Sequence, residues 1–212
     1  MQINWCFKGI QENGAFGDAE ASAVLSATGI LSTWMLANQA LPLAQANIDS
    51  QNALNASALD DHVNWYSSVA AHTPYISLSA GCMEYVGDSS APIKYTALRT
   101  ALDFATDGGT TSGYVFRCWV ITCLKHAAEL PGLAEEIRDL NLFANFYTYH
   151  IEGEVTAKLV VPRRQVQWVL KVGPNLRPIA ASWANARPGM RALRNPDFVW
   201  PDRVSNVIEA IY

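Results

Sequence analysis

The amino-acid sequence predicts an α+β fold in which most strands pair in the antiparallel direction. A short strand pattern opens the chain, two helical patterns follow, and the remaining strand patterns are interrupted by short helices. This order of elements is typical of α+β domains. Apolar residues make up 50% of the 212 residues, which is enough to bury a large core. One domain spanning residues 1–212 is therefore expected.

The first third of the chain is expected to hold one strand and two helices. The segment "INWCFKGI" alternates apolar and polar residues and predicts a short strand. Asp18 suits the N-cap of a helix that runs to Asn38, because apolar residues recur there at helical spacing. A second helix is predicted over residues 57–72, where Ser57 and Asp60 resemble a capping box.

The stretch from residue 21 to 48 carries no charge and could be read as a membrane span. A spanning helix needs about 20 consecutive, mainly apolar residues. Polar residues dilute this stretch and Pro42 interrupts it, so we expect a buried helix instead. The first ten residues lack a basic segment followed by an apolar one, so they do not indicate a secretory signal. A signal removed before the mature chain is the alternative.

The rest of the chain alternates between strand and helix patterns and ends in a proline-rich tail. Four strands are expected at "YISLS", at "YVFRCWVITCL", from Ile151 onward, and at "QVQWVLKV". Helices are expected at "KYTALRTALDFA" and "PGLAEEIRDLN". Residues 173–212 hold five of the ten prolines and predict a loop-rich C-terminal cover.

Two glutamates stand at the head of the strand that begins at Ile151. Alternation along this strand places Glu152 and Glu154 on one face with Thr156 and Lys158, whereas the apolar residues occupy the other face. Paired glutamates on a strand are either solvated surface groups or a working acidic pair. The pattern alone favours the first interpretation.

Charge and motif content exclude several classes of protein. A net charge of −4 with 15 Lys and Arg spread along the chain argues against a stable nucleic-acid binder. The four cysteines favour buried free thiols over a disulfide, and no histidine stands at zinc-ligand spacing to a cysteine pair, so no metal is expected. The glycine-rich motifs of dinucleotide-binding domains, P-loop proteins and α/β-hydrolases do not occur.

The segment "EGEVTAKLVVPRRQVQWVLKV" resembles the catalytic strand of the mono-ADP-ribosyltransferases of the Arg-Ser-Glu type. The closest resemblance is to the A subunits of cholera toxin and heat-labile enterotoxin. The order of the upstream segments "YISLS", "ALDFA" and "GYVFRCWV" is similar too, so the resemblance spans residues 3–172. It implies an ADP-ribosyltransferase-like fold of two packed, mainly antiparallel sheets flanked by helices. It also implies an enzyme that transfers ADP-ribose from NAD to a protein, with arginine as the expected acceptor and nicotinamide as the leaving group.

The resemblance implies a role for each matching residue. Glu154, Glu152 and Ser77 would be catalytic: Glu154 would stabilise positive charge on the ribose, Glu152 would orient or deprotonate the acceptor, and Ser77 would brace Glu154. Lys8, Gly9, Ser77 and Ser79 would bind NAD. The family carries an arginine at the position that matches Lys8, and lysine offers a mobile point charge instead of a rigid fork. The substrate-binding residues would be aromatic, namely Phe146, Tyr147 and Tyr149, with Phe143 before them.

Each implied role has an ordinary structural alternative. Ser77 and Ser79 can simply flank a turn, Lys8 can be a surface lysine, and the aromatic run can pack in the core. His150 next to the glutamates is read as a structural residue in preference to a general base. At the level of function, the alternatives are a binding module that has lost NAD affinity, an NAD glycohydrolase, and an enzyme that modifies a nucleic-acid base.

The biological setting follows only from the resemblance. Stand-alone domains of this family are often toxins or effectors, so secretion or delivery into a target cell is expected, with a cytoplasmic protein as the alternative. The expected partners are NAD as co-substrate and a protein of the target cell. No membrane span is expected in this chain. An accessory or delivery subunit stays an open possibility.

Overall fold

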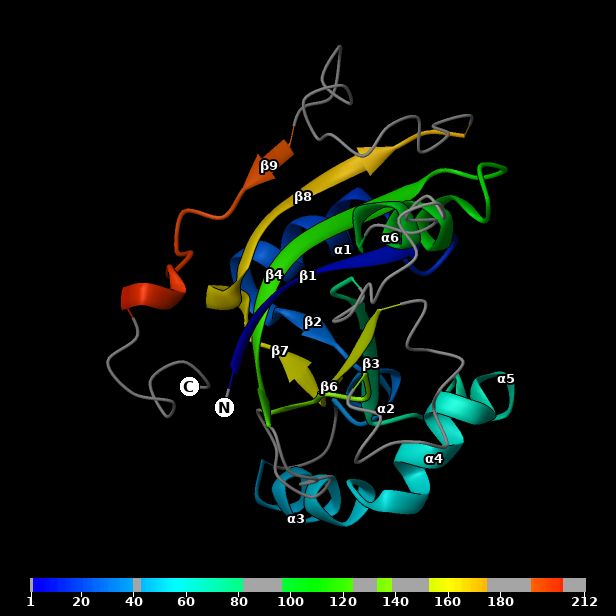
Figure 1. Ribbon diagram of the computed structural model, residues 1–212, viewed down its shortest axis with the longest axis vertical. Coiled ribbons are helices and arrows are strands. Elements are labelled where there is room, and N and C mark those ends of the chain that lie inside the picture. Colours follow the sequence, from blue (N-terminus) through cyan, green and yellow to red (C-terminus); the bar gives the residue numbers. More distant parts are fainter. Residues whose placement is uncertain are drawn as a thin grey trace, which may run out of the picture.

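The chain folds into an α+β arrangement built on one seven-stranded sheet among the residues described (Figure 1). The computed structural model describes residues 2–39, 43–81, 97–123, 133–138, 153–174 and 192–203. The expected fold class, α+β, is thereby confirmed. The strands are β1 (Gln2–Gln11), β2 (Ile30–Leu31), β3 (Tyr75–Ser79), β4 (Gly113–Cys123), β5 (Ala134–Glu135), β6 (Glu154–Lys158), β7 (Val160–Val161), β8 (Val166–Val172) and β9 (Ala192–Arg194).

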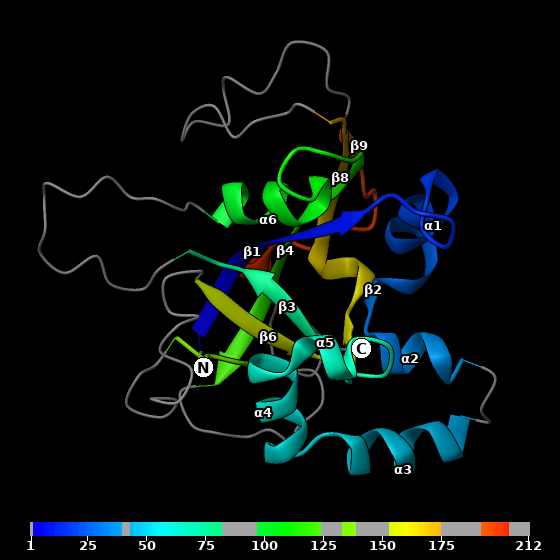
Figure 2. The same ribbon diagram turned by 90° about the vertical axis from the view of Figure 1, so that its right-hand side faces the viewer.

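The helices are short and lie on both sides of the central strands. The α-helices are α1 (Asp18–Ala23), α2 (Thr33–Ala37), α3 (Leu43–Ala53), α4 (Ala56–Asn64), α5 (Tyr66–Val69) and α6 (Ala97–Thr106). One π-helical turn, η1 (Val24–Thr28), and two 3₁₀ turns, η3 (Arg163–Gln165) and η5 (Pro201–Arg203), complete the described elements. Figure 2 shows α6 on one side of β3 and β6, and α4 and α5 on the other.

Five strands of the sheet close into a ring of pairings. β1 pairs along its whole length with β4, from Gln2↔Thr122 to Gln11↔Gly113, and its other edge pairs with β3 at Phe7↔Ser79. β3 pairs with β6, β6 with β5, and β5 with β4, which completes the ring. The β4–β5 pairing is parallel and the others in the ring are antiparallel. The main hydrophobic cluster draws on β1, β3, β4 and β6.

The expectation of two packed sheets is not confirmed by these pairings. β4 is long enough for one of its edges to pair with β8 over its first half and with β5 at its end, so hydrogen bonding joins all seven strands into one sheet. β8 and β9 extend this sheet beyond the ring. A separate two-stranded sheet is formed by β2 and β7.

The helix predicted from Asp18 to Asn38 is wrong as a single element. It is divided into α1, η1, β2 and α2, and the break falls at Gly29. Gly29 has φ of 73°, and a Cβ atom there would lie 2.3 Å from the carbonyl oxygen of Val161. The sequence pattern missed the break because Gly29 is held against β7, a contact between distant segments. None of the helices in the described ranges is long and apolar enough to cross a membrane.

Two further helix predictions need correction. The helix predicted over 57–72 is divided into α4 and α5, and its N-cap is Asn55, whose side chain accepts a hydrogen bond from Ala58 N, so Ser57 and Asp60 form no capping box. The helix predicted at "PGLAEEIRDLN" is wrong over the described residues 133–138, where Ala134–Glu135 form β5. Pairing with β4 and β6 outweighs the helical propensity of this segment.

The remaining predictions of secondary structure agree with the structure where it describes them. Strands are found at "YISLS", through "YVFRCWVITC", at β6 and at β8, and α6 covers residues 97–105 of its predicted helix and ends one residue later, at Thr106. Cys6 and Cys118 are buried free thiols, as expected, whereas Cys82 lies outside the described residues. Within the predicted C-terminal cover, Phe198 and Trp200 pack on Trp5.

Gly9 is required by the close approach of α6 to β1. A Cβ atom at Gly9 would lie 2.0 Å from the carbonyl oxygen of Ala101 and 2.8 Å from the amide nitrogen of Ala105. Both neighbours are backbone atoms of α6, so neither can rotate away. α6 therefore lies against β1 at a distance that only glycine permits.

The substitution Gly9→Ala is expected to lower the free energy of unfolding by about 1–3 kcal/mol, because α6 must shift to admit a methyl group. Gly14→Ala is the matched control, because a Cβ atom at Gly14 meets nothing within 4 Å. Urea unfolding of both variants checks this prediction. Equal stability of the two variants would contradict the contact between Gly9 and α6.

Candidate functional site

A cavity of about 900 Å³ gathers the predicted site residues that lie in the described part of the chain. Its lining comes from β1, α1, η1, β2, α2, α4, α5, β3, α6 and the first residue of β6. Five predicted site residues line it: Lys8, Gly9, Ser77, Ser79 and Glu154. The other four predicted site residues, Glu152, Phe146, Tyr147 and Tyr149, lie outside the described residues. Phe143 and His150 lie outside them too.

Strand register aligns the two serines with Glu154. Ser79 lies directly opposite Glu154 in the β3–β6 pair, and Ser77 lies opposite Thr156. Residues opposite each other in a ladder, and those two apart on one strand, share a face of the sheet. Ser77, Ser79, Glu154 and Thr156 therefore project from the same face, and the Thr156 hydroxyl approaches Glu154 Oε1 at 3.4 Å.

Glu154 is partly buried and is not a solvated residue of a surface strand. Its side chain is 13% exposed, and the next residues on the same face, Thr156 and Lys158, are buried. Gly153, with φ of 66°, sets the turn into β6, and a Cβ atom there would lie 2.4 Å from the backbone of Gly81. The interpretation of this face as solvent-exposed is thus wrong for the described part of the strand.

His62 links Thr73 and Ser77 to Glu154. Its Nδ1 lies 2.9 Å from Thr73 Oγ1, its Nε2 lies 3.0 Å from Ser77 Oγ, and Nε2 also lies 3.9 Å from Glu154 Oε1. Burial, and secondarily the charge of Lys8, lower the pKa of His62 from 6.5 to about 3. The ring is therefore neutral at pH 7, and its contact with Glu154 is not an ion pair.

A neutral imidazole carries one N–H, so one ring nitrogen donates and the other accepts. Either Thr73 or Ser77 must therefore donate its hydroxyl proton to His62, while the other hydroxyl accepts from the ring. The Thr73 hydroxyl also accepts from the amide N–H of Tyr75 at 3.3 Å. His62 thus fixes the position of Ser77, and with it the surroundings of Glu154.

The free energy of unfolding should fall on acidification, because the folded protein holds His62 in its neutral form and the unfolded chain does not. Between pH 6.5 and pH 3, the unfolded chain binds a proton on this histidine that the folded chain excludes. The free energy of unfolding should therefore decrease as the pH falls through this window, with about 3 kcal/mol lost through His62 at about pH 4.5.

Urea unfolding of the wild-type protein and of His62→Asn, each at neutral pH and at about pH 4.5, measures this contribution. The substitution removes the titrating ring from the folded and from the unfolded state. The variant should lose less stability on acidification than the wild-type protein. His72→Asn serves as the control, because His72 is exposed. The same acid-induced loss in wild type and His62→Asn would show that the ring takes up its proton in the folded state.

Lys8 is the one Lys or Arg among the described residues that line the cavity. Burial lowers the pKa of Lys8, and the nearby carboxylate of Glu154 partly offsets this shift. A cation and a carboxylate that interact electrostatically therefore both line the cavity. The cation suits an anionic group such as a phosphate, although as a point charge and not as a bidentate fork.

Two groups at the cavity were missed from the sequence. His62 lies between Leu59 and Val63 on the buried face of α4, and a histidine at helical spacing among apolar residues was the available signal. Tyr66 on α5 packs edge-on against His62 at 5.4 Å between ring centroids. Nothing in the pattern of α5 indicated that contact, because it depends on the break between α4 and α5.

Comparisons with known proteins give no family. No protein-family model and no curated protein matches the chain. Among solved structures the chain is similar to one described as "EcPltA", with a TM-score of 0.43 and 8% sequence identity, over 93% of this chain and 88% of that one. A likeness this weak does not assign the chain to a family.

Proposed function

We propose that the protein is an NAD-dependent mono-ADP-ribosyltransferase with an ADP-ribosyltransferase-like fold of two packed sheets. The observation that supports this proposal most is the convergence of Lys8, Ser77, Ser79 and Glu154 on one cavity. These residues come from three strands, β1, β3 and β6, and the resemblance implies a site role for each of them. The volume of about 900 Å³ lies within the range of cavities that hold small molecules and cofactors.

The chemistry follows from the charge that develops when the bond between nicotinamide and ribose breaks. The ribose becomes oxocarbenium-like and positively charged, and a fixed carboxylate next to it lowers the barrier. Glu154 is that carboxylate in this proposal. Ser77, held at 3.0 Å by the neutral His62, orients the glutamate or a ribose hydroxyl. Lys8 receives the diphosphate, and Gly9 contributes backbone groups to the binding of NAD.

The acceptor is an arginine of a target-cell protein in this proposal. Glu152 would orient or deprotonate its guanidinium, while Phe146, Tyr147 and Tyr149 would contact the protein substrate. These four residues lie outside the described part of the chain, so their roles rest on the sequence. Secretion or delivery into a target cell belongs to the same proposal, as does the absence of a metal cofactor.

Incubation with NAD labelled in its adenylate part, together with a protein extract, tests the transfer. Label should appear on protein in the presence of the wild-type chain and not in the presence of Glu154→Ala. Mass spectrometry of the product should place ADP-ribose on arginine. Free ADP-ribose as sole product would identify an NAD glycohydrolase, and labelled nucleic acid a different acceptor. Label transfer that survives Glu154→Ala would refute the role given to this residue.

A catalytically silent binding module is the second candidate. It is favoured by Lys8, whose lowered pKa reflects burial and whose charge is already opposed by Glu154. Such a cation has less attraction left for a phosphate. Titration calorimetry with NAD separates the candidates, since measurable binding that Lys8→Arg strengthens would count against a silent module.

A further inference from the structure

The hydroxyl of Thr100 lacks the hydrogen-bond partner that a buried polar group normally has. Thr100 lies on α6, is 7% exposed and lines the cavity, and among the described residues its Oγ1 has no partner. Thr106 on the same helix shows the usual arrangement, because its hydroxyl donates to the carbonyl oxygen of Leu102 at 2.8 Å. An unpaired buried hydroxyl raises the free energy of the fold, so a group that enters the cavity and bonds to it recovers this cost.

An exposed aromatic ring stands next to this hydroxyl. Phe104 follows Thr100 by four residues on α6, so the two side chains lie on one face of the helix. Phe104 also lines the cavity, although its side chain is 60% exposed. Ala101 and Ala105 fix the helix against Gly9 at backbone contact. Thr100 and Phe104 are thus presented to the cavity from an anchored helix.

We propose that Thr100 and Phe104 form a subsite for a purine base. A flat base can stack on the exposed face of Phe104. A threonine hydroxyl both donates and accepts, which suits the ring nitrogens and the exocyclic amino group of adenine. An aliphatic ligand would gain from the phenylalanine ring but would leave the hydroxyl unpaired.

The position of β1 sets the order of groups along the cavity. Gly9 contacts α6 next to Thr100, and Lys8, one residue earlier on β1, interacts electrostatically with Glu154. β1 therefore contacts the helix of the proposed base subsite through Gly9 and carries a cation near the carboxylate through Lys8. A dinucleotide bound with its adenine at α6 and its diphosphate at Lys8 would bring its other ribose toward Glu154. This order rests on the proposed function, whereas the base subsite does not.

Titration calorimetry with AMP, NAD and nicotinamide mononucleotide tests the subsite. Thr100→Val should weaken the binding of AMP and NAD by about tenfold, because the base loses one hydrogen bond in a buried site. It should leave nicotinamide mononucleotide, which has no adenine, unaffected. Thr100→Ser keeps the hydroxyl and should bind all three ligands as the wild type does.

Thermal unfolding without ligand provides a second readout. Thr100→Val removes an unpaired buried hydroxyl at nearly constant shape, so the melting temperature should stay the same or rise. A variant that is at least as stable yet binds AMP less tightly cannot owe its defect to misfolding. Phe104→Ala should also weaken AMP binding, whereas Leu193→Ala, an exposed apolar residue of β9, should not.

The outcomes separate this inference from the proposed function. Weaker AMP binding in Thr100→Val, without any cleavage of NAD by the wild type, would support the base subsite and reject the transferase. Cleavage of NAD that depends on Glu154, with unchanged AMP and NAD affinities in Thr100→Val, would reject the subsite alone. Equal weakening of nicotinamide mononucleotide, or failure of the wild type to bind AMP, would also overturn the subsite.

Discussion

Replacing Glu154 by Gln should slow the release of nicotinamide from NAD by about a hundredfold to a thousandfold, the usual effect of removing one group that stabilises transition-state charge. Glutamine keeps the shape of the side chain and its acceptor oxygen but not the negative charge. Because the positive charge on the ribose develops only as the bond breaks, the loss should appear in kcat more than in KM. A fluorogenic NAD analogue measures the rate directly.

The control for this variant is another glutamate of the same cavity. Glu20 lines it, is exposed, and accepts a hydrogen bond from Gly17 N at the start of α1, a contact that glutamine also makes. Glu20→Gln should therefore retain the wild-type rate. If Glu154→Gln cleaved NAD as fast as Glu20→Gln, a catalytic role for the Glu154 carboxylate would be untenable.

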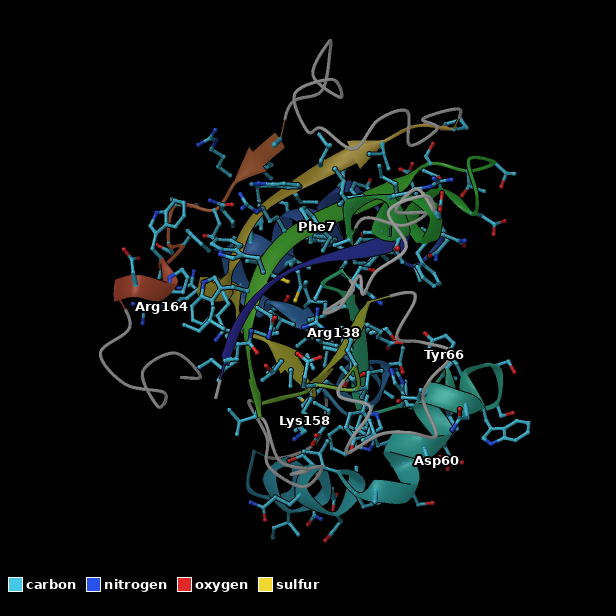
Figure 3. All side chains as sticks on the ribbon, in the orientation of Figure 1. Phe7, Asp60, Tyr66, Arg138, Lys158 and Arg164 are labelled. Carbon is cyan, nitrogen blue, oxygen red and sulfur yellow. The ribbon has the colours of Figure 1, made fainter. Side chains whose placement is uncertain are left out.

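Replacing Lys158 by Met should lower the free energy of unfolding by about 3–5 kcal/mol, which is a large part of the stability of a domain. Lys158 Nζ lies 2.8 Å from Glu135 Oε1, and both side chains are fully buried. Figure 3 shows Lys158 and Arg138 in the middle of the molecule. Methionine fills a similar volume but leaves the carboxylate of Glu135 buried without the lysine, so the cost of desolvating that charge remains. Guanidinium unfolding measures the loss.

The double variant Lys158→Met with Glu135→Leu separates lost charge from lost packing. Removal of both charges should restore most of the stability, because an apolar pair of similar volume often replaces a buried ion pair without loss. Lys171→Met is the control, since Lys171 is 45% exposed where it pairs with Glu12, and it should cost less than about 1 kcal/mol. If Lys158→Met were as stable as Lys171→Met, other groups would have to compensate the buried charge of Glu135.

A second buried ion pair supports the same region of the sheet. Arg138 binds Glu136 through two hydrogen bonds of 2.6 Å and donates to Asn4 Oδ1 at 3.0 Å and to the carbonyl oxygen of Gly81. It thereby connects the segment after β5 with β1 and with the end of β3. The sequence predicted a helix at this segment, whereas in the structure Glu135 lies in a strand and Glu135, Glu136 and Arg138 are buried.

The site could be predicted in part because its residues lie on strands. Alternation along "YISLS" and "EVTAK" depends on adjacent residues only, so the sequence places Ser77 with Ser79 on one face and Glu154 with Thr156 on one face. The register that pairs these two faces comes from the structure. Lys8 and Gly9 were accessible through the order of motifs. Gly9, however, was expected to bind NAD. In the structure, a Cβ atom at this position would meet the backbone of α6.

The sequence by itself determined the α+β class and the central strands, because local periodicity records which face of an element is buried. The candidate residues on those strands follow from the resemblance of their motifs. Only the tertiary structure decided that five strands close into a ring, that Glu135 and Glu136 lie in a buried strand and the segment after it, and that His62 and Thr100 border the cavity. These features depend on contacts between segments far apart in the chain. Periodicity within one segment holds no record of the partner that it meets.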